Sequence, residues 1–142
     1  MTKNNEPRRY WLMKSEPDAY SWADLVAEGE GTWDGVRNHR AANNLRAMRE
    51  GDEAFFYHSN IGLEIVGIVR VSVPGLVDPS DPDGKWAAVK VKAVRKLPRP
   101  VTLKQIKADP ALVDMELVRL SRLSVAEVLP SEWAHILEMS EN

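Results

Sequence analysis

The architecture of this chain follows from eleven consecutive residues near its middle, Leu63-Glu64-Ile65-Val66-Gly67-Ile68-Val69-Arg70-Val71-Ser72-Val73. β-Branched side chains dominate the run, and polar residues alternate with apolar ones along part of it, which is typical of a half-buried β-strand. Two similar runs lie on either side, over residues 53–59 and 86–96, and turn residues separate the three. Together they predict a twisted antiparallel sheet with one buried face.

Helices and further extended segments flank this sheet. Residues 9–15 predict another strand, and Leu117 to Leu123 predict a short strand or turn. Capping residues or a proline mark three helix starts, and the helical spacing of Ala41, Leu45 and Met48 indicates a fourth helix. They predict a short helix after Ser21, an amphipathic helix from Asn38 to near Gly51, a short helix after Thr102 and a final helix opened by Pro130 and Ser131. This arrangement predicts an α+β domain built as a small β-barrel or curled sheet with helices around it.

Length and composition indicate one intracellular globular domain. The chain has 142 residues, 44% hydrophobic and 28% charged, which suffices for a hydrophobic core. No apolar run reaches the roughly 20 residues of a membrane-spanning helix, and residues 1–9 lack the apolar centre of a signal peptide. Cysteine is absent, which excludes disulfides and thiolate chemistry. We expect a flexible segment over residues 1–8, a single domain over residues 9–140, and a cytoplasmic location, or a nuclear one in a eukaryote.

Basic residues are unevenly distributed although the net charge is only −2. No acidic residue interrupts the interval from Lys85 to Lys107, and a second acid-free interval contains Arg37, Arg40, Arg46 and Arg49. Lysines that alternate with apolar residues along a strand, as Lys90 and Lys92 do, either solvate its outer face or bind an anion. The clustering favours a surface for an anionic ligand.

A second chemical signal is a polar segment that also contains an aromatic residue, Trp33-Asp34-Gly35-Val36-Arg37-Asn38-His39-Arg40-Ala41-Ala42-Asn43-Asn44. A tryptophan face stacks on planar rings, asparagine offers a donor and an acceptor together, and arginine grips phosphate with two N–H groups. Because Trp33 follows a glycine-containing loop and precedes Asp34-Gly35, we expect it to be exposed. The segment is either a recognition surface for a flat polar ligand or the solvent-exposed polar face of an ordinary amphipathic helix.

Familiar catalytic and metal-binding signatures are missing from the sequence. It contains no phosphate-binding loop, no serine flanked by glycines and no histidine pair at metal-binding spacing. At the end of one predicted strand, Tyr57, His58 and Ser59 either face a ligand or bond locally to backbone. The spacing does not specify a Ser-His-carboxylate triad at this place. We therefore predict no catalytic residue, no metal and no cofactor.

Several blocks of sequence, taken in order, are diagnostic of a family. They are Tyr10-Trp11-Leu12-Met13-Lys14-Ser15-Glu16-Pro17, Trp33-Asp34-Gly35-Val36-Arg37-Asn38 with Ala41 and Asn43-Asn44, Gly51-Asp52, Phe56-Tyr57-His58-Ser59, Gly67-Ile68-Val69, and Leu120-Ser121-Arg122-Leu123-Ser124-Val125. With these blocks the chain resembles EVE-domain proteins, the group that includes the thymocyte nuclear protein family. The resemblance implies a PUA-like fold, a small mixed β-barrel flanked by short helices, related to the YTH domains that read methylated adenine in RNA.

The resemblance also implies a function. EVE domains are regarded as readers of modified bases, modified cytosine especially, and Trp33 resembles a wall of the YTH aromatic cage. We therefore expect a non-catalytic module that stacks a modified base of DNA or RNA in an aromatic pocket. The expected base-pocket residues are Trp33, Lys14, Ser15, Glu16, Asp34, Asn38, Tyr57, His58 and Ser59. The expected contacts to phosphate and backbone are Arg37, Arg40, Arg122, Lys90 and Lys92.

Two other functions stay open. Some PUA-like domains are nucleases, and the proximity of His58 and Ser59 in the sequence keeps a nucleic-acid-processing enzyme among the alternatives. An exposed Trp33 that docks a partner peptide would instead make the chain a protein-interaction module. The leading interpretation predicts nucleic acid with a modified base as the partner, and no membrane.

Overall fold

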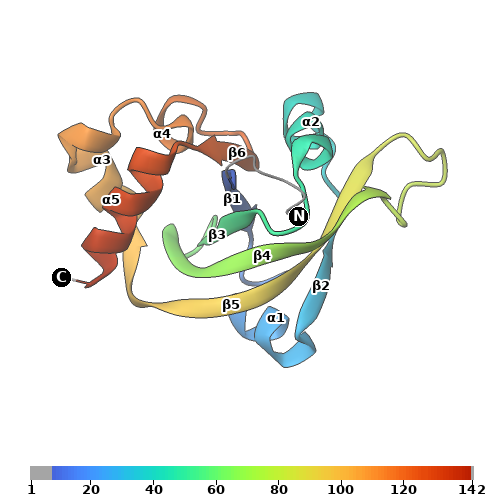
Figure 1. Ribbon diagram of the computed structural model, residues 1–142, viewed down its shortest axis with the longest axis horizontal. Coiled ribbons are helices and arrows are strands. Elements are labelled where there is room, and N and C mark those ends of the chain that lie inside the picture. Colours follow the sequence, from blue (N-terminus) through green and yellow to red (C-terminus); the bar gives the residue numbers. More distant parts are fainter. Residues whose placement is uncertain (1–7, 142) are drawn as a thin grey trace, which may run out of the picture.

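A computed structural model describes residues 8–141, in which strands and short helices alternate along the chain (Figure 1). In chain order the elements are β1 (Tyr10–Ser15), α1 (Trp22–Glu28), β2 (Glu30–Trp33), α2 (His39–Ala47), β3 (Glu53–His58), β4 (Glu64–Val77), β5 (Ala87–Thr102), α3 (Leu103–Ala108), the 3₁₀ turn η1 (Pro110–Leu112), α4 (Glu116–Arg119), β6 (Val125–Val128) and α5 (Pro130–Glu141). The predicted α+β class is confirmed. The segment predicted to be flexible, residues 1–8, lies outside the described residues except for Arg8, whose guanidinium is 3.5 Å from the Glu53 carboxylate.

The strands form one six-stranded sheet in the order β2-β5-β4-β3-β1-β6. As predicted, β3, β4 and β5 pair antiparallel, whereas β1 pairs parallel with β3 and antiparallel with β6. The long strands β4 and β5 bend strongly, so the sheet curls (Figure 1). Among residues 8–141, β2 and β6 are the two ends of the sheet, and no pairing between them closes the expected barrel.

Along β3 both faces of the sheet are buried, so the prediction of one buried face is wrong there, whereas β5 alternates as predicted, with Val91 buried and Lys92 exposed. Adjacent residues of β3 belong to different hydrophobic clusters, Phe56 to the one beneath α1 and α2, and Phe55 to the one that includes Trp133 of α5. The Trp133 ring stacks on that of Phe55 with a centroid distance of 3.9 Å. Successive strand residues point to opposite faces, so apolar neighbours such as these require cover on both sides. In β4, irregular pairing after Ile65 and Ile68 interrupts the alternation on which the prediction depended.

Gly67, in the middle of β4, lets α1 lie close against the sheet. A Cβ at this position would be 2.5 Å from the Trp22 ring, which meets Phe56 edge-on at 5.5 Å. A glycine inside a strand often marks such a close approach. As predicted, Ser21 starts α1, through a reciprocal capping box with Asp24. The packing and the cap together fix the path of the chain between β1 and β2.

Three short elements differ from the sequence prediction. Glu30–Trp33 forms β2 where the glycines predict a loop, and Val125–Val128 forms β6 beyond the predicted short strand or turn. Glu116–Arg119 forms the helix α4 at the start of that same region. Both strands are only four residues long and pair with partners distant in the sequence, so the local pattern does not reveal them. The helices predicted from Asn38 and Thr102 do begin after these residues, whose side chains cap them.

Candidate functional site

A cavity of about 600 Å³ lies where the ends of β1 and β2 meet. Its lining comes from β1, the turn that follows it, the end of β2 and the two residues after β2: Lys14, Ser15, Glu16, Ala19, Tyr20, Thr32, Trp33, Asp34 and Gly35. Three strands separate β1 from β2 in the sheet order, so the curl of the sheet brings these ends together. The cavity thus unites two segments predicted from the sequence to share one pocket, residues 14–16 and 33–34.

Trp33 is buried, and the prediction that it is exposed on a loop is wrong. Only 7% of its surface is accessible. It is the last residue of β2 and pairs with Val89 of β5. Residues of β2 alternate between faces, so Trp33 points into the core while Thr32 points outward. The Phe56 ring lies perpendicular to Trp33 with centroids 5.5 Å apart. Trp33 therefore forms part of the cavity wall with a small portion of its surface.

Tyr20 is a second aromatic residue of the cavity, and the sequence interpretation missed it. Its ring lies 6.4 Å from Trp33 at an interplanar angle of 82°, so the two rings form adjoining walls. The Tyr20 hydroxyl donates to Glu28, and a Cβ at Gly31 would collide with that hydroxyl. Burial and this hydrogen bond to the Glu28 carboxylate raise the pKa of Tyr20 above its usual value, so the phenol stays protonated at neutral pH. Glycine within β2 is the sequence signal that could have indicated a close neighbour.

Asp78 holds the end of the β2 segment in place, and it too was missed. Its buried carboxylate accepts hydrogen bonds from the Gly35 N–H at 2.8 Å, from Arg37 at 2.8 Å and from both the backbone and hydroxyl of Ser80. Burial alone would raise the pKa of Asp78, but these donors hold it well below its usual range. Asp78 is thus charged, and it anchors the residues that follow Trp33.

Some polar side chains of the cavity form hydrogen bonds within the protein, and others do not. Ser15 donates its hydroxyl to the Tyr20 carbonyl, and Lys14 donates its ammonium to the Ser121 carbonyl at 2.8 Å. Burial lowers the pKa of Lys14 from its ordinary value. By contrast, the exposed carboxylates of Glu16 and Asp34 make no side-chain hydrogen bond or ion pair with residues 8–141. The carboxylates of Glu16 and Asp34 are therefore available to accept hydrogen bonds from a ligand in the cavity.

Asn38, Arg40 and Arg122 do not line this cavity but share a neighbouring one of about 330 Å³, together with Leu120, Ser121 and Leu123. The contact between Lys14 and the Ser121 carbonyl connects the two hollows. The Asn38 side-chain oxygen caps α2 by accepting from the Ala41 N–H at 2.9 Å. Arg40 forms an exposed ion pair with Glu116 at 3.1 Å. Two of the predicted phosphate-binding arginines thus lie in the next hollow along the surface.

The other predicted phosphate contacts are more dispersed. Arg37 is paired with the buried Asp78, so its charge is already largely offset. Lys90 is the cross-strand neighbour of Thr32, which lines the main cavity, whereas Lys92 is the cross-strand neighbour of Glu30 farther along β2. Of the three, Lys90 has the position that best suits a contact beside the cavity.

Tyr57, His58 and Ser59 do not line the cavity. Tyr57 is 2% exposed and belongs to the hydrophobic cluster on the opposite face of the sheet. The His58 Nε2 accepts a hydrogen bond from the Trp22 N–H at 3.1 Å, and burial lowers the pKa of His58 although Glu64 acts in the opposite direction. The Ser59 N–H donates to the Ser15 carbonyl. The His58 ring thus bonds to backbone 36 positions away and not locally, and this Ser59 contact is made by its backbone N–H. Among residues 8–141, no serine or carboxylate hydrogen-bonds to the His58 ring.

In the described part of the chain, no group of three histidine, aspartate or glutamate side chains is placed to hold a metal ion. No helix within residues 8–141 has the length and apolar character needed to cross a membrane.

Comparison with known proteins identifies the family. The family model described as EVE domain matches residues 9–139. The chain belongs to the EVE-domain family. This EVE domain is 37% identical to mouse thymocyte nuclear protein 1 over 166 residues, which cover 93% of this chain and 74% of the mouse protein. It also superimposes on the crystal structure of the human THYN1 protein in complex with DNA that contains 5-methylcytosine, with a TM-score of 0.87, 34% identity and coverage of 94% of this chain and 98% of the human one.

A more distant likeness concerns the fold alone. The EVE domain superimposes on the crystal structure of the Pho92 YTH domain in complex with m6A, with a TM-score of 0.56 and 15% identity, over 100% of this chain and 88% of the YTH chain. The fold is therefore shared beyond the range of evident sequence similarity.

Proposed function

We propose that this EVE domain is a non-catalytic reader of nucleic acid that carries a modified base, modified cytosine being favoured, and that the base enters the cavity between β1 and β2. The proposal rests on the composition of that cavity. Trp33 and Tyr20 form adjoining walls, and the carboxylates of Glu16 and Asp34 beside them make no hydrogen bond within the described part of the chain. The complex of the human relative with DNA that contains 5-methylcytosine supports the same ligand class.

An extrahelical base matches the chemistry of this cavity. A base must leave its stack to enter a pocket, and aromatic walls replace part of the lost stacking. Because Trp33 is largely covered, the exposed part of the Tyr20 ring supplies much of the aromatic contact, and Trp33 supports it from behind. Stacking contributes about 1–3 kcal/mol per base, so contacts to the backbone must add to the affinity.

The two carboxylates favour bases that carry an exocyclic amine. Glu16 and Asp34 accept hydrogen bonds and donate none when ionised. Cytosine and adenine present an amine where thymine and uracil present a carbonyl oxygen, and carboxylates accept from the cytosine amine in nucleic-acid recognition. The cavity is therefore expected to prefer cytosine or adenine derivatives, and a methyl group would meet the carbon-rich wall formed by Trp33, Tyr20 and Ala19.

The neighbouring hollow is suited to the sugar-phosphate backbone next to the bound base. Arg40 and Arg122 line it, and Lys14 connects it to the base cavity. Phosphate contacts of this kind position a nucleic acid and weaken as salt increases. Lys90 extends the basic rim on the other side, beside Thr32. We further infer that the curled sheet corresponds to the PUA-like barrel implied by the family resemblance, open between β2 and β6.

Titration of labelled oligonucleotides tests the proposal. DNA and RNA strands with one cytosine, 5-methylcytosine, adenine or methylated adenine are compared at one salt concentration. Removing Trp33 would damage the core, so the cavity is blocked instead by Thr32→Tyr, at an exposed strand position on its wall. Val94→Tyr, at a strand residue that is 39% exposed and not on this cavity, is the matched control.

We expect one modified oligonucleotide to bind more tightly than its unmodified counterpart. Thr32→Tyr should weaken that binding about tenfold, which corresponds to about 1.4 kcal/mol of lost stacking, whereas Val94→Tyr should leave it unchanged. Absence of binding to every oligonucleotide would contradict the proposed function. Equal binding by Thr32→Tyr and the wild type would show that the base does not enter this cavity.

A further inference from the structure

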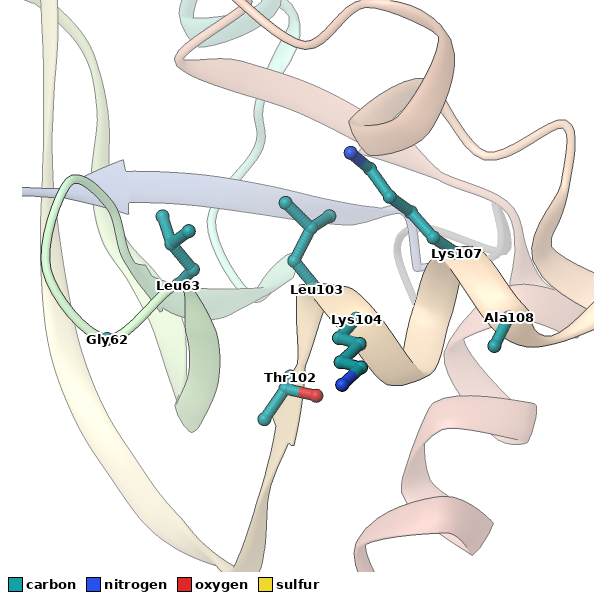
Figure 2. A pocket seen from close by; sticks show the side chains of 7 residues that line it. All are labelled: Gly62, Leu63, Thr102, Leu103, Lys104, Lys107 and Ala108. Carbon is teal, nitrogen blue, oxygen red and sulfur yellow. The ribbon is translucent and has the colours of Figure 1, made fainter.

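A third hollow, of about 590 Å³, lies between the turn that precedes β4 and the helix α3 (Figure 2). Its lining residues are Gly62, Leu63, Thr102, Leu103, Lys104, Lys107 and Ala108. We call it the α3 groove. Figure 2 shows Leu63 and Leu103 projecting in the same direction from facing segments, with Lys107 extending on that side from the next turn of the helix. None of its residues belongs to the proposed base cavity.

The turn beside the α3 groove exposes apolar side chains in a strained backbone. Asn60 and Leu63 have positive φ angles of 68° and 49°. Asparagine tolerates this conformation, but a bulky residue such as leucine seldom adopts it. Leu63 is nevertheless 43% exposed, and its neighbour Ile61 is 52% exposed. Strain and exposure together mean that folding gains little from a leucine here, which points to a binding role.

The groove itself is held in one shape. The Leu103 N–H donates to the Leu63 carbonyl at 2.9 Å and ties the turn to the start of α3. The side chains of Thr102 and Gln105 form a reciprocal capping box at the same place. The cap also occupies the Gln105 N–H, one of the donors with which the helix end would bind a phosphate. The groove is therefore preformed, and its free cationic groups are side chains.

Two unpaired lysines line the α3 groove, Lys107 on the side toward which Leu63 and Leu103 project and Lys104 pointing the other way (Figure 2). Lys104 and Lys107 are both exposed, and neither forms an ion pair or hydrogen bond with the described part of the chain. They end the acid-free interval that begins at Lys85. An aliphatic floor with positive charges at its edge is complementary to a ligand that combines an apolar side chain with carboxylates.

We propose that the α3 groove binds a short acidic peptide segment of a partner protein, with one apolar side chain inserted between Leu63 and Leu103. Carboxylates on either side of that residue meet Lys104 and Lys107. Nucleic acid fits this surface less well, because the lining has no aromatic ring for stacking and no arginine for bidentate contact with phosphate. The inference does not depend on the proposed reading of modified bases.

Selection from a displayed library of random peptides tests this inference. The folded domain serves as bait, alongside Leu63→Asn, Lys104→Glu and Lys107→Glu. Asparagine tolerates the positive φ, so Leu63→Asn removes the apolar anchor without new backbone strain. Val26→Asn, at an exposed apolar residue of α1, and Lys85→Glu, at an exposed lysine in the loop between β4 and β5, are the matched controls. Thermal melting confirms that each variant is folded.

We expect the wild type to enrich peptides in which acidic residues flank a leucine, isoleucine, valine or phenylalanine. For a synthetic peptide of the enriched sequence, Leu63→Asn and each lysine reversal should weaken binding about tenfold, whereas the controls should not. Enrichment of no peptide, or of peptides that bind all variants equally, overturns the inference. So does a titration in which oligonucleotides, and not the peptide, shift the amide resonances of Leu63 and Lys104. The variant Thr32→Tyr, in which the base cavity is blocked, should still bind the peptide. Failure of the peptide proposal can therefore be told apart from failure of the proposed base reading.

Discussion

The buried carboxylate of Asp78 accepts a hydrogen bond from the Gly35 N–H at 2.8 Å and so fixes the residues that follow Trp33. Asp78 lies just beyond β4, far from Gly35 in the sequence, and it also pairs with Arg37. The hairpin between β4 and β5 thereby controls the shape of a cavity to which it contributes no lining residue. Arg37, predicted as a phosphate contact, instead helps to neutralise this buried charge.

Replacement of Asp78 by alanine should therefore damage both stability and the site. It leaves the Gly35 N–H and the Arg37 guanidinium without their acceptor, and we expect the free energy of unfolding to fall by about 3 kcal/mol. Urea denaturation measures this loss. Asp83→Ala, at an exposed carboxylate in the same hairpin, is the control and should change stability by less than about 0.5 kcal/mol. Similar losses for both variants would show that Asp78 is not a special anchor.

Gly31→Ala should disturb the cavity without changing any residue that lines it. The new Cβ collides with the Tyr20 hydroxyl, which is held by Glu28, and is 3.1 Å from Leu25 Cδ1. Tyr20 must then shift, and we expect binding of the preferred oligonucleotide to weaken about tenfold. Addition of Tyr20→Phe removes the colliding atom and should restore much of the affinity. If Gly31→Ala binds as the wild type does, Tyr20 is not a wall of the base pocket.

The carboxylates at the cavity should determine which base is accepted. Asp34→Asn and Glu16→Gln replace carboxylates, which only accept hydrogen bonds, by amides, which also donate them. A base such as thymine, which carries a carbonyl where cytosine carries an amine, should then bind with a smaller loss of affinity. We expect the preference for cytosine over thymine at the tested position to fall about tenfold in the variant whose carboxylate contacts the base. Asp18→Asn, in the neighbouring turn but not on the cavity, is the control. An unchanged preference in both variants would exclude these carboxylates from base reading.

His58 should make stability depend on pH. Burial lowers the pKa of His58 below its ordinary value of 6.5, with Glu64 opposing, and the neutral ring accepts the Trp22 N–H. As the pH falls through 6.5, the His58 ring becomes protonated in the unfolded chain before it does in the folded protein. The stability that the neutral ring contributes is therefore present at neutral pH, decreases as the pH falls through that value, and stops decreasing below the folded pKa.

Urea denaturation at pH values from about 7.5 to about 5 measures the dependence. His58→Gln keeps a hydrogen-bond acceptor but cannot titrate, so its stability should fall less over this range. His39→Gln, at an exposed histidine, serves as the control. If the free energy of unfolding depends on pH equally in the wild type and in His58→Gln, the assignment of a neutral His58 is contradicted.

Local signals explain what the sequence could predict of this fold. The caps at Ser21 and Thr102 act within one helical turn, and the apolar spacing from Ala41 to Met48 is also local, so the sequence predicts these helix starts correctly. The inward orientation of Trp33 depends instead on the pairing of β2 with β5, a long-range contact that a glycine-rich segment does not suggest. For this reason the sequence predicts that Trp33 lies on an exposed loop.

The candidate site was predictable only in part, for a related reason. Lys14 to Glu16 and Trp33 with Asp34 were grouped through the family resemblance, and the curl of the sheet brings them together. Tyr57 lies across the sheet because successive residues of β3 alternate between two buried faces. Tyr20 enters the cavity through packing against Gly31, which no spacing rule reveals.

A nuclear magnetic resonance titration shows whether a modified base occupies the cavity between β1 and β2. Isotope-labelled protein is titrated with two oligonucleotides that differ only in the methyl group of one cytosine. We predict that the Trp33 indole and the amides of Ser15, Tyr20 and Asp34 shift with the methylated oligonucleotide, at lower concentration than with the unmethylated one. Shifts confined to other surfaces, or the same response to both oligonucleotides, would contradict the claim.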